Sequence, residues 1–354
     1  MTKRNGVLWL VAVVGLALVV YLFRSKVHFD WPMFWRQLHY LSVGHILAGI
    51  ALIYATYWLR AVRWAVFVSP TKKVSAASLL GSQFIGFTAV ALFGRLADLT
   101  RPYLVARRVE LSLSSQVAVY TIERMFDLGA AAVIFSCALA FTPKDLPHHD
   151  VFVRAGVLSM GATLAIAVFA GAIRVAGGAV AAFARGTVGL VSKSAGESIS
   201  TKILGFRDGL NALSSLRDFG VVVLLSLAMW GMIGLAYLET AHAFVQTPEL
   251  GDLTFSRTML LMAASIGGSL VQLPIIGWFT QIAVTATAMH TFYGAPIEAS
   301  TACGAMLLVV TFLCIIPTGF IYSQLEHVSL KRVAQESEAA GAAAEAPDVQ
   351  LRQR

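Results

Sequence analysis

The chain has 354 residues, of which 57% are hydrophobic and 13% are charged, about half the charged fraction of a typical soluble protein. The 27 basic and 19 acidic residues give a net charge of +8. Most basic residues flank apolar blocks, as the positive-inside rule expects of a membrane protein, and do not form a nucleic-acid surface. The composition therefore excludes an ordinary soluble domain and predicts an all-α integral membrane protein.

The first apolar block, residues 6–23, predicts a membrane helix whose start, next to Lys3 and Arg4, lies on the cytoplasmic side. It is too long for a signal peptide and no small-residue cleavage site follows it, so we expect it to be retained. All three cysteines fall in apolar blocks, which argues against a disulfide framework or a zinc site.

Residues 24–42 are expected to form an outer loop, and residues 43–68 a membrane helix. Near the end of that helix Arg60 and Arg63 are three residues apart and therefore share a face. Two interpretations are open for this pair. The arginines extend toward anionic headgroups at the interface, or they contact a lipid phosphate in a binding site.

Residues 74–93 are apolar but rich in Gly, Ser and Thr, and they lead directly into a run of charged residues. A full crossing would place that run, Arg107 and Arg108 included, on the outer side against the charge rule. A re-entrant hairpin that turns near Gly94 keeps it inside. Irregular backbone at membrane depth must be buried or line a wet cavity, so the hairpin predicts a cavity.

Further crossings are predicted at residues 113–141, 151–176, 219–245 and 299–323. The polar stretch 182–218 is expected along the cytoplasmic interface, because it has apolar residues at helical spacing. Residues 256–293 form a second apolar stretch interrupted at Pro274 and Gly277, which predicts another hairpin.

The fold predicted is thus all-α, with about six full transmembrane helices and two re-entrant helical hairpins in an inverted repeat, the pattern of many transporters. We expect a membrane domain over 1–328, divided into 1–42 (first helix and outer loop), 43–181 (first repeat), 182–218 (linker) and 219–328 (second repeat). The tail 329–354 has few apolar residues and is predicted to be disordered. Both termini are placed in the cytoplasm, in a bacterial inner membrane.

The charged run continues into the helix at 113–141, where Glu123 and Asp127 are four residues apart on one face and Arg124 lies about 100° round. Two carboxylates this close need a shared cation, and Arg95 or Arg101 is the expected partner. One interpretation is a structural salt-bridge network. The other is an anionic-headgroup site, since arginine binds phosphate bidentately, and both can hold together.

In the second hairpin Gln272 and Gln281 supply polar atoms, for helix packing or for a headgroup. Glu239 and His242, near the outer end of their helix, are either a proton relay or a solvated pair. No nucleotide-binding, metalloprotease or nucleophile-elbow motif occurs in the sequence. We expect no enzymatic activity, no catalytic residue, no cofactor and no metal.

Four segments together, "YWLRAVRW", "GRLADLTRPYLVARR", "IERMFDL" and "LPIIGWFTQ", resemble the transmembrane region of lysylphosphatidylglycerol synthases, also called the flippase-like domain family. The second segment is similar to the family's P-x-R-x-G-E-x-x-R run, with Arg95 and Arg101 matching. It departs from that run at three positions, Phe93, Ala97 and Asp98. In the last segment Pro274 matches, while isoleucines replace two glycines and Gln281 stands in place of glutamate.

The resemblance implies a lipid transporter or flippase-like protein that moves or presents a polar or anionic lipid. The departures point to a divergent branch with another lipid, such as an isoprenoid or hopanoid-type molecule. The aminoacyltransferase domain of fused family members is not in this sequence, so lysyl transfer is not expected. The substrate-binding residues expected are Arg60, Arg63, Arg95, Asp98, Arg101, Glu123, Arg124, Asp127, Gln272, Pro274 and Gln281.

The alternative is a non-catalytic accessory protein that binds a lipid-linked intermediate for a separate glycosyl- or aminoacyl-transferase. An integral-membrane transferase has less support. The expected partners are a membrane lipid with an anionic or polar headgroup and, beyond it, a second copy of the chain or a lipid-modifying enzyme, but no nucleic acid.

Overall fold

The computed structural model describes residues 29–141, 144, 149–190, 192–211, 215–268 and 276–345. Within these ranges the side chains of 95, 96, 170, 202, 205, 206, 208–211, 276, 338 and 340–345 are outside the description. The first predicted membrane helix, residues 6–23, lies outside the described residues.

The described part of the chain is helical, without strands. Its helices are α2 (Trp31–His39), α3 (Val43–Val68), α4 (Ala76–Phe93), α5 (Thr100–Val109), α6 (Leu113–Ala140), α7 (His149–Gly189), α8 (Lys193–Asn211), α9 (Leu216–His242), α10 (Pro248–Gly251), α11 (Phe255–Gly268), α12 (Ile276–Tyr293), α13 (Ile297–Thr311), α14 (Ile316–Leu325) and α15 (Leu330–Glu345). Two short 3-10 helices, η1 (Gly94–Ala97) and η2 (Leu313–Ile315), connect α4 to α5 and α13 to α14.

Local sequence explains where several of these helices begin. Ser75, Ser112 and Ser215 each precede a helix, and their hydroxyl oxygens accept a hydrogen bond from a backbone N–H of the first turn. Such N-caps satisfy donors that the start of a helix leaves unpaired. The chain turns at Gly94, where φ is +68°, a left-handed conformation that favours glycine.

Five segments are long and apolar enough to cross a membrane: α3, α4, residues 149–169 of α7, α9, and residues 297–325 of α13 and α14. The protein is therefore a multi-pass membrane protein. Helix α6 also has sufficient length, at 28 residues, but carries Glu123, Arg124 and Asp127 near its middle. The predicted helix at 151–176 extends to Gly189, with a kink at Ala176.

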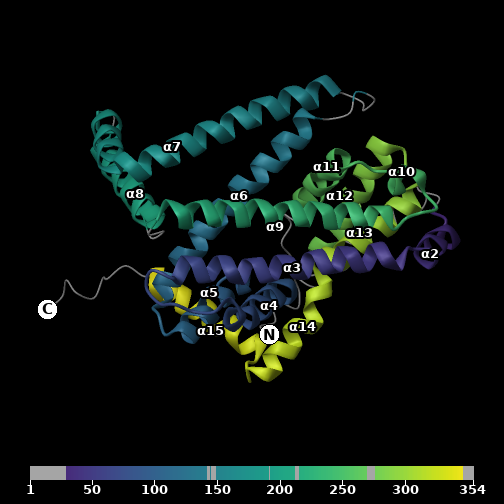
Figure 1. Ribbon diagram of the computed structural model, residues 1–354, viewed down its shortest axis with the longest axis horizontal. Helices are drawn as coiled ribbons and strands as arrows, with labels where there is room; N and C mark the ends of the chain where they lie inside the picture. Colours follow the sequence, from purple (N-terminus) through teal and green to yellow (C-terminus); the bar gives the residue numbers. More distant parts are fainter. Residues whose placement is uncertain are drawn as a thin grey trace, which may run out of the picture.

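Helices α3 and α9 lie side by side along the long axis of the molecule and form a central pair (Figure 1). At one end of the pair the amide N–H of Ser42 donates to the carbonyl oxygen of Ala243, 2.9 Å away. Helices α2, α10, α11 and α12 lie toward this end, and α5, α8 and α15 toward the other (Figure 1).

The first helical hairpin consists of α4, η1 and α5. Its two open ends lie together, because the ammonium of Lys72, just before α4, is 2.9 Å from the carboxylate of Glu110, just after α5. The guanidinium of Arg108 also donates to the carbonyl oxygen of Ser78. The chain thus reverses between residues 76 and 109, with its turn at Gly94.

The second helical hairpin consists of α11 and α12. Its open ends also lie together, since the hydroxyl of Tyr293 donates to the carbonyl oxygen of Arg257 over 2.7 Å. The two helices approach closely at Gly268, where an added Cβ would lie 2.9 Å from Cα of Gln281. The open ends of this hairpin lie near α2 and α10, whereas those of the first hairpin lie near the end of α3.

The predicted disordered tail is wrong for residues 330–345, which form α15. Leu330, Val333 and Ala334 are buried against a cluster that includes Ile85 of α4 and Ala97 of η1. The hydroxyl of Ser337 lies 3.2 Å from that of Thr100. The low apolar content of this segment did not indicate a helix, because only one narrow face of α15 is apolar. That face packs against the first hairpin.

Candidate functional site

Arg63 of α3 is the centre of a buried ion-pair network. It is fully buried, and its two terminal nitrogens each lie 2.6 Å from a carboxylate, one from Glu123 and one from Asp127. The same side chain donates to the hydroxyl of Ser226 on α9, also at 2.6 Å. One guanidinium therefore bridges the two acids of α6 and ties three helices together.

Arg101 of α5 completes the pairing of Glu123. It makes a two-pronged contact, with Nη2 at 2.6 Å from Oε2 and Nη1 at 3.0 Å from Oε1. Its guanidinium also lies 4.7 Å from the ring centre of Trp64, 4.8 Å from that of Phe87 and 5.2 Å from that of Tyr120. Bidentate pairing and aromatic stacking are the contacts that suit arginine in a buried place.

The sequence positions explain this geometry. Glu123 and Asp127 are one helical turn apart, so one arginine reaches both carboxylates. Arg101 reaches Glu123 because the chain turns at Gly94 and because α5 packs tightly on α4 at Gly86. An added Cβ at Gly86 would lie 2.7 Å from Cβ of Arg101. Of the two predicted partners, Arg95 or Arg101, Arg101 pairs with Glu123, but the cation that Glu123 and Asp127 share is Arg63.

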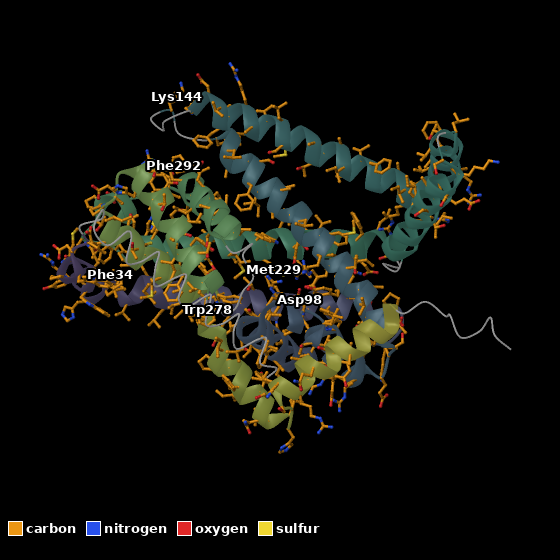
Figure 2. The ribbon with its side chains drawn as sticks, turned by 180° about the vertical axis from the view of Figure 1, so that it is seen from behind. Phe34, Asp98, Lys144, Met229, Trp278 and Phe292 are labelled. Carbon is orange, nitrogen blue, oxygen red and sulfur yellow. The ribbon has the colours of Figure 1, made fainter. Side chains whose placement is uncertain are left out.

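A cavity of about 390 Å³ lies beside this network, lined by Gly94 at the turn of the first hairpin and by Gly277 and Trp278 near the start of α12 in the second. Its described wall comprises Arg60, Val90, Ala91, Gly94, Arg124, Asp127, Trp230, Ile233, Tyr237, Met262, Ile266, Gly277, Trp278, Gln281, Thr311 and Phe312. Asp98 and Trp278 lie near the middle of the molecule, one from each hairpin (Figure 2). The wall is thus largely apolar, with its charge confined to α3 and α6.

Arg60 and Arg124 bring positive charge to this wall. Arg124 Nη2 is 2.8 Å from Asp127 Oδ2, and its side chain keeps 39% of its surface exposed. Arg60 Nη1 is 3.6 Å from the same oxygen, which is too far for a hydrogen bond. Arg60 Nη1 and Arg124 Nε are buried N–H donors without a hydrogen-bond acceptor.

On the opposite wall, Ser265 joins Tyr237 of α9 to Gln281 of α12. The hydroxyl of Tyr237 donates to Oγ of Ser265 over 2.9 Å, and the amide of Gln281 donates to the same oxygen over 2.7 Å. This network is neutral. It links the second hairpin to α9 in the way that Arg101 links the first hairpin to α6.

Glu239 and His242 do not contact each other in the way a direct relay needs. The carboxylate of Glu239 lies 2.6 Å from Nδ1 of His45 on α3. His242 Nε2 lies 2.8 Å from the carbonyl oxygen of Leu253. The two histidine rings are 5.9 Å apart, near the end of the α3–α9 pair and away from the cavity wall.

Among the described residues, no group of three or more His, Cys, Asp or Glu side chains is arranged to hold a metal ion. The carboxylate on the described cavity wall, that of Asp127, is already contacted by Arg60, Arg63 and Arg124. The wall therefore offers guanidinium groups to a ligand, and its acid serves to hold them.

The comparison with protein families supports a membrane lipid role. A family model described as the lysylphosphatidylglycerol synthase TM region matches residues 8–320. The chain belongs to this family. Neither curated proteins nor solved structures give a match. Membership relates the protein to membrane lipids.

The family resemblance noted in the sequence covers residues that the structure places in three positions. Arg60, Arg124, Asp127 and Gln281 line the cavity, whereas Arg63, Arg101 and Glu123 form the network behind it. Asp98 is half-buried between η1 and α5. The side chain of Arg95 and the whole of Gln272 and Pro274 lie outside the described residues.

Four aromatic residues of the described wall were not predicted from the sequence: Trp230, Tyr237, Trp278 and Phe312. A signal for Trp230 was present, because it lies in the middle of the 27-residue helix α9. Tryptophans of membrane helices concentrate at the two interfaces, so one at mid-helix points to a polar site inside the membrane. No comparable signal marks Tyr237, Trp278 or Phe312.

Proposed function

We propose that this protein is a lipid transporter of the flippase type in the bacterial inner membrane, with both termini in the cytoplasm. An anionic headgroup would occupy the cavity between the hairpin turns, on Arg60 and Arg124, while the lipid tail stays in the bilayer. The observation that carries the proposal is the position of two arginines with unpaired N–H groups on the wall of a largely apolar cavity.

The free energy of moving a charged headgroup through the bilayer supports a polar path through the protein. A charged group at the centre of a bilayer costs several kcal/mol, so spontaneous movement of an anionic headgroup between leaflets is slow. Guanidinium groups held at mid-depth offset that cost with bidentate hydrogen bonds and charge. The neutral network around Ser265 supplies the other wall, where dipoles and aromatic rings replace charges.

The hairpins give the proposal its geometry. Each has its open ends together, and the open ends lie toward opposite ends of the α3–α9 pair (Figure 1), with Gly94 of the first hairpin and Gly277 of the second on the cavity wall. We propose that both are re-entrant and that α3–α6 and α9–α14 form an inverted repeat. Transporters with this arrangement place the substrate where the repeats meet.

We also propose that the lipid is carried without chemical change. Asp127 is the carboxylate of the described wall and is paired with arginines, so it is not placed to act as a general base.

The test is leaflet exchange of a fluorescent phosphatidylglycerol in liposomes that contain the purified protein. We expect the protein to accelerate exchange and Arg124→Gln to reduce the acceleration at least about tenfold, as for loss of a hydrogen bond to a charged group. Arg154→Gln is the matched control, because Arg154 is exposed on α7 and is not on the cavity wall.

Two outcomes would contradict the proposal, the first its transport activity and the second the role of the cavity. Binding of the lipid without any acceleration would favour the accessory protein that hands a lipid-linked intermediate to a separate enzyme. An equal loss of lipid exchange in the Arg124 and Arg154 variants would show that the cavity is not the transport site. Mass spectrometry of the lipids after exchange checks that none has been converted.

A further inference from the structure

The unpaired polar atoms around the cavity are all hydrogen-bond donors. On the described wall they are Arg60 Nη1, Arg124 Nε and the indole Nε1 of Trp230. Arginine and tryptophan side chains can only donate. A buried donor without an acceptor costs free energy, so a ligand that satisfies these groups must bring acceptor atoms.

The Asp127 carboxylate and the Ser265 hydroxyl, two acceptors at the cavity, are already engaged. The Asp127 carboxylate receives Arg63 at 2.6 Å and Arg124 at 2.8 Å, with Arg60 at 3.6 Å. Ser265 receives donors from both Tyr237 and Gln281. A cationic group entering the cavity would therefore find no unshared carboxylate among the described wall residues.

The charge balance points the same way. The network and wall together hold the guanidinium groups of Arg60, Arg63, Arg101 and Arg124 and the carboxylates of Glu123 and Asp127. Among these six described side chains, four positive and two negative groups leave an excess of two positive charges beside the cavity. An ammonium group would add a third, and like charges at low dielectric repel strongly.

We infer that the headgroup bound here is an anionic phosphate ester without an ammonium group, and that Trp230 is a binding residue that donates its indole N–H to the phosphate. The inference rests on the proposed function and deepens it. The three unpaired N–H groups lie on α3, α6 and α9, so three helices would donate to the phosphate oxygens at once.

The rest of the wall favours a lipid phosphate over a free one. Val90, Ile233, Met262, Ile266 and Phe312 give the cavity an apolar side. A free phosphate would leave that side unmatched, whereas the first carbons of a lipid would cover it. Selectivity would thus have two parts, a phosphate on the arginine side and an apolar stem on the other.

The inference is tested by calorimetric titration of the purified full chain with dioctanoyl lipids below their micelle concentrations. The probes are phosphatidic acid, phosphatidylglycerol, its lysyl ester, phosphatidylethanolamine and diacylglycerol, with glycerol 3-phosphate as the tail-free arm. We expect the first two to bind and each of the others to bind at least about tenfold more weakly, because each lacks the phosphate or the tail or adds an ammonium.

Trp230→Phe keeps an aromatic ring but removes the N–H. It should weaken phosphatidylglycerol binding about three- to tenfold, leave diacylglycerol binding unchanged and leave the melting temperature within about 2 °C. Trp58→Phe is the matched control, since Trp58 is exposed on α3 and off the cavity wall. A Trp230 variant that binds phosphatidylglycerol like the parent protein would overturn the role of the indole.

Equal or tighter binding of the lysyl ester would overturn the exclusion of ammonium headgroups, while accelerated exchange would leave the proposed transport standing. Equal binding of glycerol 3-phosphate would assign the site to a free phosphate and overturn the lipid source. If no lipid binds and none is exchanged, the proposed function fails together with the inference.

Discussion

The two helical hairpins solve the same structural problem with different chemistry. The first, α4–α5, is held to α6 by Arg101 and Glu123, a buried ion pair within a network centred on Arg63. The second, α11–α12, is held to α9 through Ser265, which accepts hydrogen bonds from Tyr237 and Gln281. Both hairpins also depend on a glycine at the close approach of their two helices.

This difference in chemistry predicts that the two hairpins differ in rigidity. A buried charge network is costly to assemble and very costly to break in part, so it fixes the first hairpin and the arginines in one geometry. Neutral hydrogen bonds in a membrane contribute much less each, about 0.6 kcal/mol on average. We therefore expect the second hairpin to move more readily, with the first acting as the fixed side of the cavity.

The largest expected effect on this contrast comes from removing Glu123 of α6, the acid that Arg63 and Arg101 share. Glu123→Gln leaves Arg63 and Arg101 without their common carboxylate, and we expect a loss of about 3 to 5 kcal/mol of stability. Thermal and denaturant unfolding in detergent measure it. Glu123→Asp should lose less, because the charge remains; equal losses would show that side-chain shape and not charge holds this hairpin.

Glycine substitutions compare the close approaches directly. Gly86→Ala places a Cβ 2.7 Å from Cβ of Arg101, and Gly268→Ala places one 2.9 Å from Cα of Gln281, so each hairpin must open. We expect each variant to cost about 1 to 3 kcal/mol. Gly231→Ala on α9 is the control, since no atom lies within 4 Å of its added Cβ.

For these variants the unfolding midpoint is the first readout and lipid exchange the second. If Gly86→Ala and Gly231→Ala unfold at the same temperature, the packing of α5 on α4 is looser than described. If Gly268→Ala alone keeps its stability but loses exchange, motion of the second hairpin is the step that the substitution blocks.

Tyr237→Phe is expected to have the smallest effect. It removes one donor to Ser265, whose oxygen still accepts from Gln281, so the loss should be about 0.6 kcal/mol and at most about 1.7 kcal/mol. Chemical denaturation resolves a change of this size in a two-state transition. A loss as large as that of Glu123→Gln would contradict the contrast between the two hairpins.

The sequence predicted the local parts of the site well. Helical spacing and the need to pair buried charges predicted that Glu123 and Asp127 share a cation, with Arg95 or Arg101 as the partner. The structure pairs Arg101 with Glu123, while Arg63 is the cation that both acids share. The membrane character and the family were likewise evident, because apolar blocks and an ordered set of motifs lie within single stretches of chain.

What the sequence did not resolve depends on contacts between distant segments. Arg60 and Arg63 share a helix face, yet Arg63 is sealed by Glu123 and Asp127 while Arg60 reaches the cavity. Trp230 and Tyr237 join the site only because α9 packs against α3. Helix α15 forms because its narrow apolar face meets the first hairpin, which composition alone does not encode.

The most direct test of the account is an experimental structure of the full chain in nanodiscs of phosphatidylglycerol. We predict a lipid phosphate within hydrogen-bonding distance of Arg60 and Arg124, between the hairpin turns, with the acyl chains leaving toward the bilayer. A structure in which residues 76–93 cross the membrane alone, and Arg101 and Glu123 lie in bulk water, would contradict it.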